Sequence, residues 1–574
     1  MKKLLSNLKF TWKYAKGQKK YLIIFMIANM INILFSIITP ILSAKVIIEL
    51  TTNNYLQIIF ISLMILFVNL IVNTMHYIIR RCSIKIYANT LSLLEVDLGK
   101  NILKIENECL DTKGSGLFIQ RLTNDTSRLA DIFGFLIERI SNIIKCIGIL
   151  VAILIVNKIV FIYILMTLII LYIFESIRTT KRNKNDKMVR KAKEKVTGFI
   201  GELVRGAKDI KMLNSEDDFT NELDTIIKDE FSKRIKMQKN SLNYTYIGWE
   251  LDNIFSFILI CLLVLLIYDG IIVPAIALVL YNYSNNIGYS MTLIGEILEN
   301  IKDFNLSSER VIDVINSEKF KKEQFGNIHL NKVHGDFEFK NVKFSYKDKE
   351  VFKKLNFKIN ANETVAFVGK SGAGKTTIFN LLCKMYNISD GEITIDGINI
   401  NKLDKDSIRG NITIISQNPY IFNMSIKDNL RLVKSNLTDL EMEMACKVAC
   451  LDEFINELPD KYDTIIGEGG VNLSGGQKQR LAIARALVQK TEIILFDEAT
   501  SALDNETQLK IQKAIENMKE EYTILIIAHR LSTIINADRI LFLDNGKIIA
   551  EGNHKELLNN CLEYKNLYET EIIK

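Results

Sequence analysis

The chain has 574 residues, of which 48% are hydrophobic and 24% are charged, and its net charge is +7. This length predicts about three to four domains, and the hydrophobic share is high for a wholly soluble protein. The lysines are scattered rather than gathered in one block, which argues against a nucleic-acid-binding protein. The eight cysteines show no metal-ligand spacing, so we expect free, reduced thiols.

The first 20 residues mix large apolar side chains with lysines. This pattern indicates an amphipathic segment, residues 1–20, that lies at the inner surface of a membrane. A disordered basic tail is the alternative. The apolar run that follows, residues 21–50, is too long for the hydrophobic part of a cleavable signal peptide. We therefore expect this run to remain in the membrane.

Six apolar stretches come near or above the ~20 residues that a membrane-spanning helix requires. They are residues 21–50, 55–79, 132–156, 158–175, 247–268 and 271–295. The links between the first and second, the third and fourth, and the fifth and sixth stretches are very short. The loops between the second and third and between the fourth and fifth stretches are long and rich in lysine and arginine. Basic loops face the cytoplasm, so both termini and the soluble part are expected there. The long loops read as helix, so the membrane helices are expected to continue into the cytosol.

Four charged residues lie close to the apolar stretches. Glu138 and Lys145 lie near the third, and Glu250 and Asp252 lie at the start of the fifth. Ionisable groups inside a membrane are costly and often mark a substrate path. The alternative places them at the level of the lipid headgroups, where they cost little. The sequence leaves both interpretations open.

A polar linker, residues 319–335, separates the membrane domain, residues 21–318, from a soluble domain, residues 336–574. The soluble domain opens with short apolar alternations that predict strands. Tyr346 lies just past one of these strands, where an aromatic ring could stack on a purine or fill a structural position.

A glycine-rich loop, Gly369–Thr377, stands between an apolar strand and a helical run. The pattern G-x-x-x-x-G-K-[ST] in this setting predicts a phosphate-binding loop. Gly372 and Gly374 allow the backbone to turn its N–H groups toward one anion, and the helix that follows adds its positive end. We expect Lys375 to reach the outer phosphates and the Thr376 hydroxyl to bind Mg²⁺.

Further polar residues follow apolar strands later in the chain. Gln417 comes after the strand at residues 412–415, and polar groups at such strand ends commonly face a ligand crevice. The strand at residues 492–496 ends in Asp497, a candidate Mg²⁺ ligand, and Glu498, a candidate general base. His529 follows another apolar strand and could contact the γ-phosphate.

A second glycine-preceded helix start, Leu473–Gln477, provides another anion site. Together these motifs resemble the ATP-binding cassette family, and the whole chain is similar to a half-size exporter of that family. The resemblance implies an all-α six-helix transmembrane domain followed by an α/β P-loop NTPase cassette with an antiparallel β subdomain. It also implies catalytic roles for Glu498, Gln417 and His529, and an Mg²⁺ site formed by Thr376, Gln417 and Asp497. The implied ATP-binding residues are Tyr346, Gly369, Ser371, Gly372, Gly374, Lys375, Thr376, Thr377, Ser474, Gly476, Gln477 and Asp504.

The resemblance further implies a dimer, because in the family the phosphate loop of one chain faces the signature segment of another, with ATP between them. Intact motifs favour a homodimer, and a heterodimer stays open. The stretches near Gly114–Thr123 and Gly201–Lys211 resemble the coupling helices that touch the cassette. One departure is the sequence Gly467–Gly470, which lacks the arginine that family members often carry there.

We therefore expect ATP-driven export of an amphiphile (a lipid, a drug-like compound or a small peptide) across a bacterial cytoplasmic membrane by alternating access. Import by the same architecture, as in siderophore transporters, and an ATP-gated channel or regulator are the alternatives. A soluble cassette ATPase acting in DNA repair or translation is disfavoured by the six apolar stretches. The expected partners are a second half-transporter chain, the lipid bilayer and the cargo, and no nucleic acid.

Overall fold

The computed structural model describes residues 2–51, 54–288, 292–316, 319–347, 349–467, 470–498, 521–527 and 534–572, together with single positions between 506 and 516. The chain forms two compact units. The helical unit comprises Met1–Leu103 and Gly114–Phe320, and the cassette unit comprises Lys104–Lys113 and Lys321–Lys574. A short piece of the first long loop thus belongs to the cassette unit.

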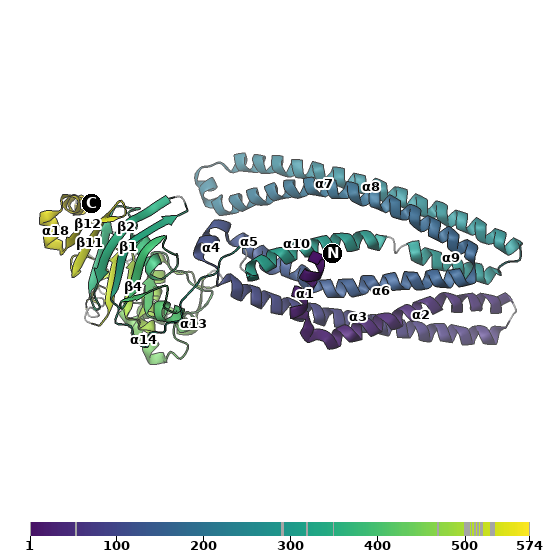
Figure 1. The fold of residues 1–574 in the computed structure, drawn as a ribbon, viewed down its shortest axis with the longest axis horizontal. Helices are drawn as coiled ribbons and strands as arrows, with labels where there is room; N and C mark the ends of the chain where they lie inside the picture. Colours follow the sequence, from purple (N-terminus) through teal and green to yellow (C-terminus); the bar gives the residue numbers. More distant parts are fainter. Residues whose placement is uncertain are drawn as a thin grey trace. The chain divides into compact units, whose positions relative to one another are not determined.

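The helical unit consists almost entirely of long helices (Figure 1). Their bounds are α1 Lys2–Ala15, η1 Lys16–Gln18, α2 Lys19–Thr51, α3 Tyr55–Ile102, α5 Ser115–Gln120, the π-helical η2 Arg121–Asp125, α6 Thr126–Val156, α7 Lys158–Met212, α8 Glu216–Tyr268, α9 Pro274–Gly288 and α10 Thr292–Asn316. α7 has 55 residues and α8 has 53. At 1.5 Å per residue each is about 80 Å long, far more than the ~30 Å core of a bilayer.

Within the described residues, five helices are long and apolar enough to cross a membrane. They lie within Lys2–Leu50, Tyr55–Ile102, Gly116–Val156, Lys158–Arg182 and Glu216–Tyr268, and they contain the first five predicted stretches. Of the sixth, residues 271–295, the structure describes α9, which has 15 residues, and the start of α10. Residues 289–291 lie outside the described part of the chain.

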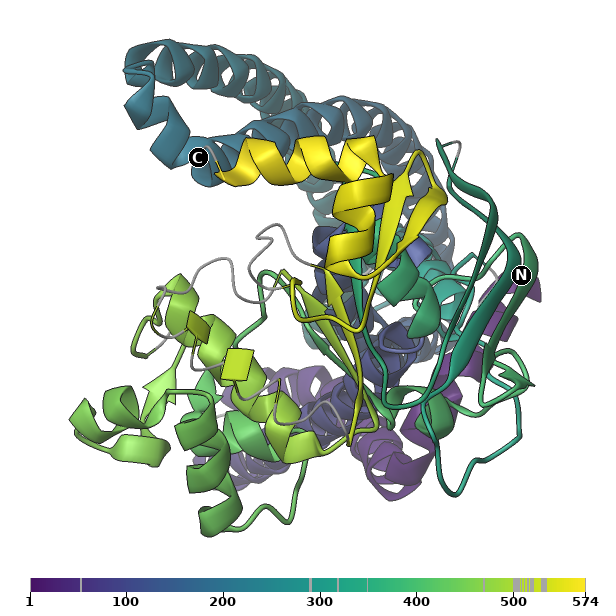
Figure 2. The same ribbon diagram turned by 90° about the vertical axis from the view of Figure 1, so that its left-hand side faces the viewer.

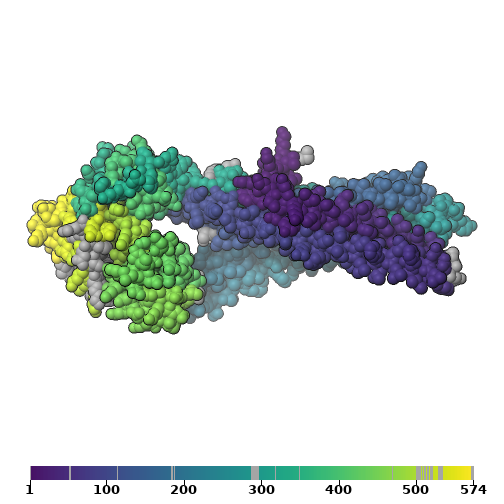
Figure 3. All heavy atoms as spheres, turned by 90° about the horizontal axis from the view of Figure 1, so that it is seen from below, coloured from purple at the N-terminus to yellow at the C-terminus, as the bar shows by residue number. Residues whose placement is uncertain are grey.

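The long helices pack in antiparallel pairs. α2 lies beside α3, and α7 lies beside α8 (Figure 1). α9 contacts α2, α6, α7 and α8, and its Tyr283 is 1% exposed and donates a hydrogen bond to the Ile37 carbonyl at 2.8 Å. α2 and α3 form much of the surface of the helical unit on the face drawn in Figure 3. Large apolar side chains such as Leu56 and Phe67 are exposed on α3, as suits a helix in lipid.

α1 is a helix with one face buried, and not a disordered tail. Thr11 and Ala15 are fully buried, and α1 contacts α3, α6 and α10. The Lys3 ammonium lies 2.6 Å from the Glu309 carboxylate, and the Tyr14 hydroxyl donates to Asp97 at 2.5 Å. The N-terminal segment is therefore anchored to the other helices by polar contacts.

The cassette unit is built on a six-stranded sheet in the order β12-β11-β3-β10-β9-β6. These strands are β3 Thr364–Gly369, β6 Ile412–Ile415, β9 Ile493–Asp497, β10 Thr523–Ile527, β11 Arg539–Asp544 and β12 Lys547–Gly552. All neighbours are parallel except β11 and β12. Consecutive residues of the central strands enter two different hydrophobic cores: Ala366 and Val368 face one, and Val365 and Phe367 face the other. This burial on both faces explains why the strands are continuous apolar runs in the sequence.

The second sheet is antiparallel, in the order β2-β1-β4-β5. Its strands are β1 Phe337–Tyr346, β2 Lys349–Ile359, β4 Asp390–Ile395 and β5 Ile398–Asn399, and a two-stranded sheet pairs β7 Met424–Ser425 with β8 Ile465–Ile466. Stacked rings of Phe339 and Phe357, with centroids 4.5 Å apart, contribute to the core between the two larger sheets.

The helices of the cassette unit are α4 Asn107–Lys113, α11 Lys375–Leu382, α12 Lys405–Arg409, α13 Ile426–Arg431, α14 Asp439–Val448, α15 Asp452–Glu457, the 3₁₀ turn η4 Lys461–Asp463, α16 Gly475–Gln489, α18 His554–Asn560 and α19 Leu562–Ile572. Helices α13–α15 lie on the opposite side of the six-stranded sheet from β1 and β2 (Figure 2). The predicted fold class, a helical membrane domain followed by an α/β cassette with an antiparallel β subdomain, is confirmed.

The segment predicted as a linker makes regular contacts with the cassette. Lys321–Gly335 belongs to the cassette unit by its packing. The backbone N–H groups of His334, Gly335 and Asp336 donate to the Asp396 carboxylate at 2.7–3.1 Å. Glu323 forms two hydrogen bonds with Arg409, at 2.6 and 3.0 Å. Most of this polar segment is therefore held against the cassette ahead of β1.

Candidate nucleotide and magnesium site

The phosphate loop joins β3 to α11, as the sequence predicted. Gly374 has φ +105° and Gly372 has φ +82°, a region that side-chain-bearing residues rarely adopt. A Cβ atom on Gly374 would also lie 2.6 Å from a ring carbon of Phe352. Both glycines are therefore required by the backbone path that brings the chain into the N-terminus of α11.

Lys375 is the first residue of α11, and its side chain folds back over the loop. The ammonium group donates to the carbonyl oxygens of Gly369 at 2.8 Å and Lys370 at 3.1 Å. Burial lowers the pKa of Lys375, while the nearby carboxylates of Glu498 and Asp497 act in the opposite direction. Because phosphate oxygens form stronger, charge-assisted hydrogen bonds than carbonyls do, an arriving phosphate is a better partner for this cation.

Thr376 on helix α11 and Asp497 at the end of strand β9 are brought together in the fold. The Thr376 hydroxyl donates to the Asp497 carboxylate at 3.2 Å, and Asp497 is 8% exposed at the end of β9. A hydroxyl and a carboxylate are oxygen ligands of the kind that Mg²⁺ prefers. The described residues hold no cluster of three or more His, Cys, Asp or Glu able to bind a metal by themselves. This agrees with the way Mg²⁺ is commonly held, by one or two protein oxygens together with phosphates.

Glu498 follows β9 directly and has an unusual backbone conformation, with φ +51°. Its backbone N–H donates to the Ile527 carbonyl at 2.9 Å, which ties Glu498 to the last residue of β10. The Gln417 side-chain amide donates to the Glu498 carboxylate at 2.5 Å. Gln479 of α16 in turn donates to the Gln417 carbonyl at 3.2 Å. The structure thus places Gln417 and Glu498 in contact beside the phosphate loop, at the carboxyl ends of parallel strands.

Tyr346 ends β1 and is half-buried among aromatic rings. Its ring centroid lies 5.1 Å from that of Tyr386, in an edge-to-face arrangement. The Tyr386 hydroxyl donates to the Asp111 carboxylate of α4 at 2.5 Å. Burial and this hydrogen bond raise the pKa of Tyr386. No sequence pattern marked Tyr386 or Asp111, because the contact joins two segments that are 275 residues apart.

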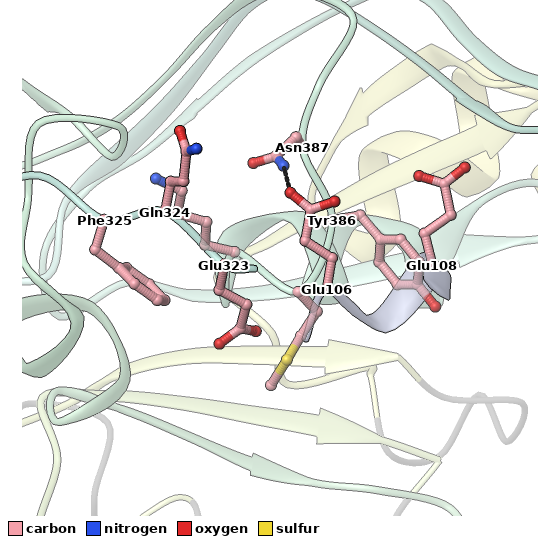
Figure 4. A pocket seen from close by; sticks show the side chains of 9 residues that line it. Glu106, Glu108, Glu323, Gln324, Phe325, Tyr386 and Asn387 are labelled. Atoms are coloured by element: carbon pink, nitrogen blue, oxygen red, sulfur yellow. Dashed lines mark hydrogen bonds between the residues drawn. The ribbon is translucent and has the colours of Figure 1, made fainter. Parts of the chain in front are cut away.

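Around this contact, α4 and the residues before it pack within the cassette unit. The Asn387 amide donates to the Glu106 carboxylate at 3.1 Å, and a pocket of about 320 Å³ lies beside this pair, lined also by Glu323 and Phe325 (Figure 4). The piece of the first long loop that belongs to the cassette unit is Lys104–Lys113, directly before the stretch near Gly114–Thr123, whose role as a coupling segment stays a prediction. Residues Gly201–Lys211 lie inside α7, in the helical unit.

The signature segment forms the N-terminus of α16. Ser474 accepts a hydrogen bond from the Gln477 backbone N–H at 3.2 Å, and the Gln477 side chain accepts one from the Ser474 N–H at 2.8 Å. This reciprocal cap leaves Ser474 exposed and Gly476 half-buried. Among the described residues, no hydrogen bond or ion pair joins this segment to the phosphate loop.

Of the remaining predicted residues, Ser371 is exposed and Thr377 is 7% exposed on the inner face of α11. Asp504 and His529 lie outside the described residues, as do Glu468 and Gly469 of the segment that departs from the family pattern. Each of the eight cysteines is free.

Known proteins resemble both units of this chain. The sequence profile of the ABC transporter family matches residues 352–501, and that of the ABC transporter transmembrane region matches residues 22–291. The chain is 29% identical to YfiC of Bacillus subtilis, named an uncharacterized ABC transporter ATP-binding protein, over 99% of this chain and 94% of that protein. It is 31% identical to the ATP-dependent lipid A-core flippase of Wigglesworthia glossinidia brevipalpis, over 83% of this chain and 82% of that protein.

Among solved structures, a bacterial Atm1-family ABC exporter with ATP bound has the same fold, with a TM-score of 0.82 and 22% identity, covering 97% of this chain and 98% of that chain. The two sequence profiles, the relative at 31% identity and this shared fold cover both units of the chain. The chain therefore belongs to the ABC transporter family, as a half-size exporter and a multi-pass membrane protein whose ATPase is coupled to transport.

Proposed function

We propose that this ABC exporter moves an amphiphile (a lipid, a drug-like compound or a small peptide) out across a bacterial cytoplasmic membrane, as a homodimer that uses ATP and Mg²⁺. The observation that carries the proposal is one arrangement in the cassette unit. There, the Thr376–Asp497 pair and the Gln417–Glu498 pair meet at the carboxyl ends of parallel strands, beside the loop that holds Lys375. The same chain carries five helices of membrane-spanning length among its described residues.

In this proposal, each side chain has a separate task. The loop N–H groups and Lys375 bind the β- and γ-phosphates, and Tyr346 stacks on the adenine ring. Thr376, Asp497 and Gln417 hold Mg²⁺, which offsets charge on the phosphates when bound. Glu498 accepts a proton from the attacking water, and Gln417 orients the Glu498 carboxylate by the hydrogen bond described above. His529 is assigned a contact with the γ-phosphate.

The dimer in this proposal is supported by the signature segment. Ser474 and Gly476 stand at a capped helix N-terminus, which favours an anion, yet among the described residues this segment has no bond to its own phosphate loop. A second chain would bring its phosphate loop to this helix end, with Asp504 near the junction. ATP then shifts the equilibrium toward the closed dimer, because only that state completes its binding site.

The expected topology follows from the basic loops. The first 20 residues lie on the inner surface of the membrane, and both termini and the cassette are cytoplasmic. The membrane domain extends to about residue 318, and the segment at residues 319–335 leads into the first strand of the cassette at Phe337. Closure of two cassettes would be carried to the membrane by the long helices as a rigid-body motion.

The first test is the ATPase rate of the purified chain in lipid vesicles, wild type against Glu498→Gln. We expect the variant to lose at least about 100-fold, because it lacks the general base. Glu492→Gln is the matched control: it makes the same change immediately before β9, away from the site. An inactive wild type that binds ATP would overturn the homodimer and point to a missing partner chain.

Direction is tested in the same vesicles. ATP is added outside to chains whose cassettes face outward, and labelled amphiphiles, lipids and peptides are followed. Accumulation inside the vesicles supports export. ATP-dependent loss of preloaded cargo indicates import, and ATP-dependent ion current without cargo movement indicates a channel; either of these results contradicts the proposal.

A further inference from the structure

A second pocket lies inside the helical unit, where α7, α8 and α9 meet. The space between its atoms is about 380 Å³, part of which is open to the surroundings. Its lining residues are Tyr163, Ile164, Thr167, Leu168, Leu171, Asp252, Phe255, Ser256, Ser284, Asn285 and Ile287. Residues 163, 167 and 171 follow one stripe of α7, and the lining residues of α8 fall within one turn, so each helix presents a single face to the pocket.

The pocket lies at a depth that the bilayer core reaches. Asp252 is about 24 Å from the end of α8 at Tyr268, and Thr167 is about 14 Å from the start of α7 at Lys158, at 1.5 Å per residue. Both distances are shorter than the ~30 Å core. A carboxylate at this depth is costly unless it has a partner, so such residues commonly belong to functional sites.

The Asp252 carboxylate lines this pocket. Among the described residues, its carboxylate makes no hydrogen bond and no ion pair, and the residue is exposed to the pocket. Among the described residues, the hydroxyl groups of Ser256 and Ser284 also make no hydrogen bond, and both residues are half-buried. Of the four charged residues singled out in the sequence, Asp252 is the one that lines this pocket; Glu138, Lys145 and Glu250 do not.

Two aromatic rings complete the lining around the acid. The Tyr163 hydroxyl donates to the Phe255 carbonyl at 2.6 Å. This hydrogen bond ties α7 to α8, and it already uses the hydroxyl hydrogen of Tyr163. What these side chains offer a ligand is therefore their ring faces. The face of an aromatic ring attracts a cation. A carboxylate also attracts a cation, and this attraction is stronger in a site with little water than in bulk water. The described lining residues include no lysine or arginine that would favour an anion.

From this arrangement we propose that the pocket binds the cationic head of an amphiphilic cargo, a lipophilic ammonium or phosphonium group, with Asp252 as its counter-charge. This inference rests on the proposed export function and names the charge of its cargo. Tyr163 and Phe255 surround the cation, and Ser256 and Ser284 accept hydrogen bonds from an ammonium. A neutral or anionic amphiphile of the same shape gains none of the charge attraction.

The test compares two hydrophobic ions of nearly equal size and shape, the tetraphenylphosphonium cation and the tetraphenylborate anion. Equilibrium binding of each is measured on the purified full-length chain in vesicles of neutral lipid, with protein-free vesicles subtracted. We expect the wild type to bind the cation at least about tenfold more tightly than the anion. Asp252→Asn should lower the affinity for the cation about tenfold or more, and Asp252→Glu should restore most of it.

Glu250→Gln is the matched control, because it removes the same charge two residues away on α8, outside the pocket lining. Its affinity for the cation should equal that of the wild type. ATP affinity, measured on every variant, verifies that the chain is folded. Equal cation affinity of Asp252→Asn and wild type, equal affinity of the wild type for the two ions, or no cation binding at all would each overturn the inference.

The proposed function has a separate readout. ATP hydrolysis by the wild type that is lost in Glu498→Gln leaves the export proposal standing even where the cation test fails. Absence of that hydrolysis defeats the export proposal whatever the pocket binds.

Discussion

The nucleotide site and the membrane pocket differ in how their polar groups are used. In the cassette, Thr376 is bonded to Asp497 and Gln417 is bonded to Glu498, so the side chains hold one another in place. In the pocket, one hydrogen bond, from Tyr163 to the Phe255 carbonyl, crosses between helices, and the Asp252 carboxylate makes none within the described residues. One site is internally satisfied and the other leaves its charge for a ligand.

This difference reflects two kinds of task. Hydrolysis requires reacting groups within a few tenths of an ångström of one geometry, which a bonded network provides. Cargo binding requires groups that gain a partner on binding, because that gain drives affinity. Changes in the cassette should therefore abolish activity for every cargo, whereas changes in the pocket should alter which cargo is accepted.

The largest expected effect is that of Lys375→Ala. It removes the buried cation of the phosphate loop, and we expect ATP hydrolysis to fall at least about 100-fold, a loss near 3 kcal/mol in the transition state. Lys370→Ala, a change of an exposed lysine in the same loop, should stay within about twofold of the wild type. The ATPase rate is measured with and without amphiphiles. Recovery of Lys375→Ala by any cargo would break the distinction between the two sites.

A smaller effect is expected at Gly374, where a substitution changes the backbone geometry of the phosphate loop and not its charge. Gly374→Ala combines φ +105° with a Cβ atom 2.6 Å from Phe352, and should destabilise the cassette by about 2–4 kcal/mol. Gly372→Ala shares the unfavourable φ, but its Cβ meets no atom within 4 Å, so it should cost about 1 kcal/mol. The midpoint of thermal unfolding without nucleotide measures both. Equal midpoints for the two variants would show that the loop relaxes and is not held rigid.

A third change tests the contact between the aromatic cluster and α4. Tyr386→Phe keeps the ring against Tyr346 but removes the hydrogen bond to Asp111, worth about 1–3 kcal/mol for a charged acceptor. We expect ATP affinity within about twofold of the wild type and a fall of about two- to tenfold in cargo moved per ATP hydrolysed. The two rates are measured in the same vesicles.

Tyr568→Phe is the matched control for this change, because it removes a tyrosine hydroxyl from the C-terminal helix α19 of the same unit. An unchanged ratio of transport to hydrolysis in Tyr386→Phe would show that this contact does not serve coupling.

Much of the cassette could be predicted because its chemistry lies in short, contiguous segments. Residue type and the preceding apolar strands make two segments recognisable in the sequence: Gly369–Thr376 and the pair Asp497–Glu498. Parallel strands bring the ends of such strands to one edge of a sheet. Glu498 could be predicted as a carboxylate at that edge. Its left-handed backbone, its backbone bond to Ile527 and its side-chain bond to Gln417 could not, because they depend on how separate strands lie side by side.

The contacts that could not be predicted join distant segments without a motif. α4 has seven residues and no periodic signal in the sequence, so its packing within the cassette unit was not predicted. Asp252 could be noticed as a charge near a membrane span. Whether it faced lipid headgroups or a pocket depended on the rotation of α8 against α7 and α9, which apolar composition does not specify.

The smallest expected effect concerns a surface carboxylate that belongs to neither site. Asp404 caps α12 by accepting from the Ser407 N–H at 2.8 Å and lies 2.8 Å from His329. The hydrogen bonds from Ser407 and His329 lower the pKa of Asp404 from 3.8 to about 2. Because the folded state holds the ionised form more strongly, this contribution to stability is complete above about pH 4 and is lost as the pH falls toward 2.

Asp404→Asn should therefore lower the thermal midpoint by a degree or so at pH 7, and the difference from the wild type should shrink as the pH falls from 4 to 2. Asp406→Asn, two residues further along α12, is the control. Neither variant should change ATP hydrolysis or cation binding, because a solvated carboxylate with local partners contributes only to local stability. A constant midpoint difference across this pH range would mean that the cap acts through its shape and not its charge. Asp404 would then stabilise α12 only by the geometry of its hydrogen bonds, like the hydrogen-bonded side chains of the nucleotide site. Asp252 differs from all of these groups, because its charge is available to a ligand.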